Sequence, residues 1–299
     1  MRVKYCSAAC QRNHWPTHKA ECKLRAVELR DEALFKDPPA KEDCPICFLP
    51  MPAQLIYCIS LPPATISSVP IYDFAIANVE LAGTSMEKYY PCCGKSICEG
   101  CSYSNIMSGN ENRCPFCNSD RGSETDDEMV EEIMKRVEAN DAASIYLLGN
   151  SYENGLLGLQ QDRAKATELY ARAANLGFSK AHNNLANVYH EGGNMKKAKF
   201  HFEAAAMAGD EVARFNLGVI EVNLGNMGRA VKHWNIAASA GCYRAMHQLT
   251  VFYKKGCGSR ESIIVMLSIN STLTAYNNSC VEMRSEARDA CIRFKTEIN

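Results

Sequence analysis

The chain has 299 residues, of which 46% are hydrophobic and 22% are charged, and its formal net charge is -1 at pH 7. This length predicts about two domains, and the absence of a basic excess argues against a general nucleic-acid binder. No apolar segment reaches the ~18 residues that a membrane helix needs, and no hydrophobic signal opens the chain. We therefore expect a cytoplasmic or nuclear protein without membrane or nucleic-acid partners.

Cysteine is the unusual component, with sixteen residues in the chain. A reducing compartment keeps thiols free, so clustered cysteines in such a protein are expected to bind metal and not to form disulfides.

Residues 1–26 hold a small cluster of cysteine and histidine. Cys6 and Cys10 are four residues apart, as are His18 and Cys22, so each pair would face one way from a helical turn. Four such ligands suffice for one tetrahedral zinc ion. The cluster resembles the second half of a MYND finger, a family that binds short peptides. The first two cysteine pairs of that motif are absent, so either the half present makes one site or the start of the chain is missing.

Residues 27–43 are charged and end in an Asp-Pro-Pro run, which predicts a short helix followed by a linker. The next segment, residues 44–118, contains three C-x2-C pairs and one adjacent pair of cysteines. These eight thiolates match the ligand count of two closed tetrahedral zinc sites. A closed site leaves no position for a substrate, so we expect the zinc to build a fold and not to do chemistry.

The eight-cysteine segment resembles a RING finger, in which the first and third ligand pairs share one zinc ion and the second and fourth share another. The resemblance implies one site made of Cys44, Cys47, Cys98 and Cys101 and a second made of Cys92, Cys93, Cys114 and Cys117. Lys95 stands where most RING fingers have a histidine ligand. Cys92 is therefore expected to replace that histidine, and Cys58 is the alternative.

RING fingers commonly act as ubiquitin ligases, which bind a ubiquitin-conjugating enzyme in a shallow groove and hold its ubiquitin in a reactive pose. The resemblance implies two groove residues, Ile46 between the first two ligands and Pro115 between the last two. Asn118 stands where a basic residue often braces ubiquitin, and Arg121 follows three residues later. This departure, together with Lys95, favours the alternative of a non-catalytic scaffold.

Residues 119–140 form an acidic segment that precedes the C-terminal half. Thr125 and Glu128 have the spacing of a capping box, and apolar residues at a spacing of four follow them. We expect an amphipathic helix over about 126–139 that docks against the next domain.

Residues 141–256 contain an internal repeat of two predicted helices. Alanines at 166, 198 and 230 and glycines at 177, 209 and 241 recur every 32 residues. Alanine lets the helices pack closely, and glycine ends the second helix with a positive φ. Because a unit of ~30 residues cannot bury its own core, the units must stack into a solenoid. They resemble Sel-one-like repeats, relatives of the tetratricopeptide repeat, which implies a concave face that binds a protein or peptide.

The predicted fold is mainly α: a partial MYND-like finger and a RING-like α+β module, both stabilised by zinc, followed by an α-solenoid of helix pairs. Residues 257–299 are expected to form a helical cap. The order of these parts resembles an expanded family of diatom proteins. The RING resemblance implies two zinc ions in the RING-like module, and the MYND resemblance implies one more at the N-terminus. Together, the RING and repeat resemblances imply a ubiquitin ligase that binds a conjugating enzyme through the RING and a protein substrate through the repeats, with no catalytic side chain of its own.

Overall fold

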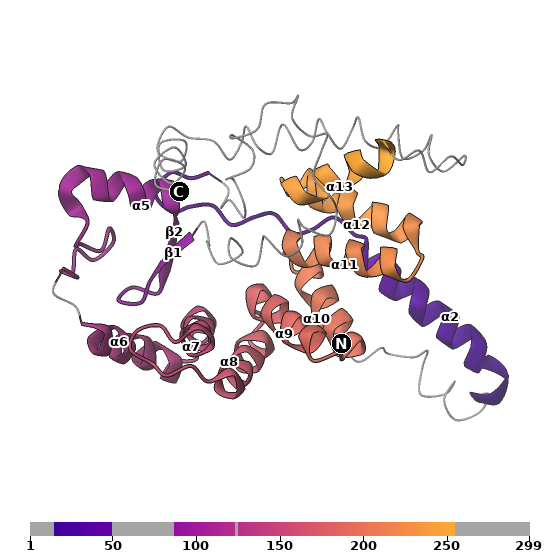
Figure 1. Cartoon of the computed structure of the whole chain (residues 1–299), viewed down its shortest axis with the longest axis horizontal. Helices are drawn as coiled ribbons and strands as arrows, with labels where there is room; N and C mark the ends of the chain where they lie inside the picture. Colours follow the sequence, from indigo (N-terminus) through magenta and orange to yellow (C-terminus); the bar gives the residue numbers. More distant parts are fainter. Residues whose placement is uncertain (1–14, 50–86, 123–124, 255–299) are drawn as a thin grey trace.

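The computed structural model describes residues 15–49, 87–122 and 125–254. Within these ranges the protein is mainly helical, as predicted (Figure 1). Cys6, Cys10, Cys58 and the predicted cap at 257–299 lie outside the described residues. No helix in the described ranges has the length and apolar character needed to cross a membrane.

A stack of helices forms the C-terminal part of the structure, and each helix packs chiefly against its neighbours in the chain (Figure 1). The helices are α6 (Asp126–Glu138), α7 (Ala142–Asn154), α8 (Arg163–Asn175), α9 (Ser179–Glu191), α10 (Met195–Met207), α11 (Glu211–Asn223), α12 (Met227–Ser239) and α13 (Tyr243–Lys254). Packing between sequence neighbours is the defining property of a solenoid.

The repeated small residues explain this stacking. Ala166, Ala198 and Ala230 are all buried between helices. The glycines that follow α8, α10 and α12 have φ values of 89°, 95° and 92°. Because this left-handed backbone is strained for other residues, glycine ends each second helix there, as the repeat predicted.

Helix α6 packs on the first repeat. Thr125 and Glu128 form the predicted capping box, in which each side chain accepts a hydrogen bond from the other residue's backbone. Ile133 and Val137 are buried against Ile145 of α7. The acidic segment is therefore part of the solenoid's first core and not a free spacer.

The cysteine-rich module is small. It contains a two-stranded antiparallel sheet of β1 (Glu87–Tyr90) and β2 (Lys95–Cys98), then α5 (Glu99–Asn105) and a π-helical turn, η1 (Ile106–Asn110). Its buried core consists of four cysteines, Tyr90 and Ile97. A core of this size is marginal by itself, so bound metal is expected to supply much of the module's stability.

One long helix, α2 (Trp15–Leu34), crosses the expected boundary at residues 26 and 27. His18 and Cys22 lie on this helix, and their side chains are outside the described part of the structure. The chain after α2 passes α11, where Lys41 lies 3.7 Å from Glu211, and continues toward the cysteine module (Figure 1).

Candidate metal centre

Two tight loops carry the first and last cysteine pairs, Cys44–Cys47 and Cys114–Cys117. In each loop, the residue after the second cysteine donates its N–H to the carbonyl of the first cysteine, at 2.8 Å and 2.9 Å. That residue, Phe48 or Asn118, has a left-handed backbone with a φ of 53° or 58°. The same turn therefore folds both loops, and it brings the two sulfurs of each pair close together.

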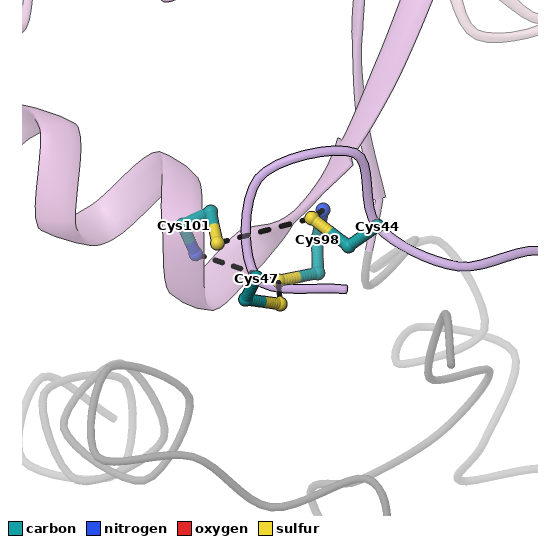
Figure 2. Close-up of side chains that lie close together, drawn as sticks. All are labelled: Cys44, Cys47, Cys98 and Cys101. Carbon is teal, nitrogen blue, oxygen red and sulfur yellow. Dashed lines mark hydrogen bonds between the residues drawn. The ribbon is translucent and has the colours of Figure 1, made fainter. Parts of the chain in front are cut away.

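The first cluster joins one of these loops to the end of β2 and the start of α5 (Figure 2). Sγ atoms of Cys44, Cys47, Cys98 and Cys101 all lie within 4.8 Å of one another. The sulfurs of Cys44 and Cys101 are 3.8 Å apart, as are those of Cys47 and Cys98. Zinc with four thiolates at about 2.3 Å places neighbouring sulfurs roughly 3.8 Å apart. The cluster therefore fits a tetrahedral zinc ion.

The second cluster joins the other loop to the turn between β1 and β2. Its four sulfurs, from Cys92, Cys93, Cys114 and Cys117, also lie within 4.8 Å of one another. The Cys93 and Cys114 sulfurs are 3.7 Å apart. Lys95 stays outside the cluster, with its Nζ 4.8 Å from the centre of the Phe116 ring. Adjacent cysteines can therefore both face one cluster, and the lysine takes no part in it.

The electrostatics of both clusters favour a bound cation. Burial raises the pKa of Cys93 to about 12 and also raises the pKa of Cys101, and neighbouring thiols add to the effect at both residues. Burial also tends to raise the pKa of Cys44, but hydrogen bonds from backbone N–H groups outweigh burial and lower the pKa of that thiol to about 7. Hydrogen bonds from Ser119 lower the pKa of Cys117 to about 6. Four thiolates this close repel one another, so a divalent cation is needed to hold all of them ionised.

The two clusters alternate along the chain, and they contain the same two sets of four cysteines that the RING resemblance implied. We propose that each set binds one zinc ion. Every position of a tetrahedral zinc would then be filled by sulfur, which leaves no place for a substrate or a water. The metal would hold the module together, and any function would reside on the module's surface.

That surface carries the predicted groove residues. Ile46 has 41% of its area exposed, and Phe48 has 77% exposed. Pro115, at the matching place in the other loop, is half-buried. Arg121 turns toward the module, where its Nη1 lies 3.5 Å from the Cys92 sulfur and its guanidinium stacks over Tyr90. Phe48, directly after the first cysteine pair, is a second exposed apolar residue of this loop, and the sequence analysis did not single it out.

The module also docks on the solenoid, which the sequence did not predict. Arg136 of α6 donates to the carbonyls of Pro91 at 2.7 Å and Cys92 at 3.1 Å. The Tyr89 hydroxyl lies 2.5 Å from Asp141 Oδ2, at the start of α7. Burial, with help from Asp141, raises the pKa of Tyr89 to about 12, so the hydroxyl stays a donor. These contacts fix the cysteine module on the first repeat.

Comparisons with known proteins agree with two parts of this description. Residues 1–22 match the MYND finger family, and residues 142–178, 179–210 and 213–242 match the Sel1 repeat. These two matches do not extend to residues 44–118. No curated protein matches the chain.

Solved structures with similarity to the chain include three bacterial proteins. A protective antigen of uropathogenic Escherichia coli strains with an SLR fold is 22% identical, over 66% of this chain and 44% of that one, with a TM-score of 0.43. A Sel1 repeat protein from Oxalobacter formigenes is 22% identical, over 62% and 71%, with a TM-score of 0.44. An immunity protein from Pseudomonas aeruginosa is 16% identical, over 61% and 82%, with a TM-score of 0.31. The chain spans less than half the length of the first of these.

The predictions of a MYND-type finger, Sel1 repeats and zinc as the cofactor are therefore confirmed. Zinc-finger modules combined with a Sel1 solenoid indicate a scaffold for protein–protein interaction.

Proposed function

We propose that the eight-cysteine module is a RING finger and that the chain is a ubiquitin ligase whose repeats hold a protein substrate. The observation that carries this proposal is the exposed Ile46 side chain between two cysteines of the first cluster. An apolar side chain presented on a rigid metal loop contributes little to the core of its own module. It is therefore suited to docking another protein.

The proposed mechanism is catalysis by positioning. A closed zinc site supplies no acid, base or nucleophile, so the module would accelerate transfer by holding the conjugating enzyme and its ubiquitin in a reactive pose. The hydrogen bonds of Tyr89 with Asp141 and of Arg136 with Pro91 support this mechanism. These contacts between the cysteine module and the solenoid would hold a substrate on the repeats at a fixed distance from the enzyme.

A non-catalytic scaffold is the second candidate, and two residues favour it. Asn118 occupies the place where a basic residue would brace ubiquitin, and it takes the left-handed turn that closes the loop. Arg121, the nearest basic residue that follows, already contacts Cys92 and Tyr90. A scaffold would use the same exposed surface to bind a protein other than a conjugating enzyme.

The test is the affinity of the full chain for a panel of ubiquitin-conjugating enzymes, with zinc content measured in every sample. We expect at least one enzyme to bind, and Ile46→Ala to weaken that binding about tenfold or more at unchanged zinc content. Leu176→Ala is a matched control, because Leu176 is an exposed leucine of the solenoid, and it should bind like the wild type. Failure of every enzyme to bind the zinc-loaded chain would favour the scaffold.

A further inference from the structure

A segment from the N-terminal part of the chain crosses the solenoid at α10, α11 and α12 (Figure 1). We call this segment, residues 30–41, the strap. It comprises the last turn of α2 and the extended chain that follows. Leu34 is buried in the core formed by α10 and α11. Arg30 pairs with Glu203 of α10, and Asp31 pairs with Arg229 of α12.

A buried arginine of the solenoid binds the end of helix α2. Arg214 of α11 is only 2% exposed, and its Nη1 donates to the carbonyl of Leu34 at 2.8 Å. Its Nη2 donates to the carbonyl of Ala206 at 2.8 Å. The last carbonyls of a helix lack partners within the helix and carry partial negative charge. The arginine thus recognises a helix C-terminus through the backbone, with no need for a particular side chain there.

Phe35, the residue that follows Leu34 in the strap, places an aromatic ring on the solenoid. The Phe35 ring lies 4.7 Å from the ring of His233, and the cationic groups of Arg229 and Lys232 lie 5.1 Å and 5.4 Å from the ring centre. His233 is fully buried, and neither of its ring nitrogens has a hydrogen-bond partner among the described residues. The face therefore combines an aromatic site with cations around it, as recognition surfaces often do.

The extended half of the strap continues along the loops between repeats. Pro39 lies against Gly209, where an added Cβ would come within 3.3 Å of the proline ring. Lys41 Nζ donates to the carbonyl of Ala240 at 2.9 Å and lies 3.7 Å from Glu211. The strap thus contacts the solenoid through backbone recognition, an aromatic anchor and ion pairs, which is how a bound peptide is held.

Among the side chains of α2 that the structure describes, the buried attachment is confined to the strap. Leu34 is the only buried residue of α2 among its described side chains, and Leu24, Val27 and Leu29 are exposed. The solenoid helices pack on their own neighbours in sequence, so their stack does not depend on the strap for its continuity. A segment held by few buried contacts can open locally while the rest stays folded.

We propose that the face formed by α10, α11 and α12 is a peptide-binding site and that the strap is its built-in occupant. The partner it fits is a helix C-terminus that ends in Leu-Phe and carries Arg-Asp in the preceding turn, which is the chemistry of the strap itself. A partner must displace the strap, whose tether gives it an effective concentration on the order of millimolar. This inference does not depend on the ubiquitin-ligase proposal.

The experiment uses the full chain and a fluorescent peptide of residues 27–42. The wild type should bind the peptide weakly because the strap competes for the same face. The variant Leu34→Ala/Phe35→Ala, whose own strap has lost its anchors, should bind it about tenfold more tightly or better. Leu29→Ala changes an exposed leucine of the same helix and should behave like the wild type. A peptide with both anchors replaced by alanine should bind none of these proteins.

The proposal is overturned if the folded double variant binds the peptide no better than the wild type. A second measurement needs no variant: hydrogen exchange of the wild-type chain should show amides of the strap opening while those of α11 stay protected. Simultaneous exchange of both would make the strap an inseparable part of the fold and would also overturn the proposal.

Discussion

Cys92 and Cys93 are adjacent, and both of their sulfurs belong to the second cluster. This arrangement predicts that Cys92→Ser removes one zinc ion per chain, because a serine hydroxyl is a much poorer ligand for zinc than a thiolate. Cys58→Ser is the matched substitution at the alternative ligand, and it should leave the zinc content unchanged. Native mass spectrometry of both variants measures the metal directly. Loss of zinc in the Cys58 variant alone would reverse the assignment.

His233 makes stability depend on pH. Burial, followed by the charge of Arg214, lowers the pKa of this imidazole from 6.5 to about 3. The unfolded chain then takes up the proton near pH 6.5 while the folded chain does not, so stability is lost as pH falls from about 6.5 toward 3. At about pH 5 the loss from this residue is about 2 kcal/mol.

The variant His233→Phe removes this titration and keeps an aromatic ring against Phe35. Urea unfolding at about pH 7.5 and about pH 5 should show a smaller loss of stability on acidification than in the wild type. His190→Phe places the same substitution on the exposed end of α9, and it should keep the wild-type difference. An unchanged difference in the His233 variant would contradict the assignment.

At the scale of elements, α11 and α12 approach each other closely at a glycine. A Cβ added at Gly218 would lie 2.2 Å from Nε1 of Trp234, which is buried and donates to the Phe215 carbonyl at 3.2 Å. Gly218→Ala should therefore lower the free energy of unfolding by about 1–3 kcal/mol. Gly228, in the first turn of α12, meets nothing within 4 Å. Gly228→Ala should raise the free energy of unfolding by about 0.5–1 kcal/mol. Thermal unfolding compares the two variants, and equal changes in their melting temperatures would refute the close packing of Gly218 against Trp234.

The elements that the sequence predicted well are those set by local signals. The capping pair at Thr125 and Glu128 and the spacing of apolar residues placed α6 within one residue of its observed end. The recurring alanines and glycines predicted the helix pairs of the repeats. The full extent of α2 was not predicted, because it has no amphipathic periodicity and its buried residue, Leu34, is held by Arg214, 180 positions away. No local pattern encodes such a contact.

At the scale of the whole molecule, polar contacts between distant segments join the parts. Lys180 pairs with Glu87 at 2.8 Å, and Tyr89 contacts Asp141, so the cysteine module is fixed to the first repeats. The strap binds the later repeats. The sequence indicated which cysteines share a cluster because the RING resemblance supplied the pairing. It could not indicate this docking, because single polar residues such as Tyr89 look the same whether they face solvent or another domain.

In the proposed ligase, a zinc module would position ubiquitin and the attached solenoid would hold the substrate. The most direct test is ubiquitin transfer by the zinc-loaded full chain across a panel of conjugating enzymes, with Ile46→Ala beside the wild type. We expect ubiquitin transfer with at least one enzyme, and a loss of transfer of about tenfold or more in the variant at equal zinc content. Transfer that the variant retains in full, or the absence of transfer with every enzyme, would contradict the ligase proposal.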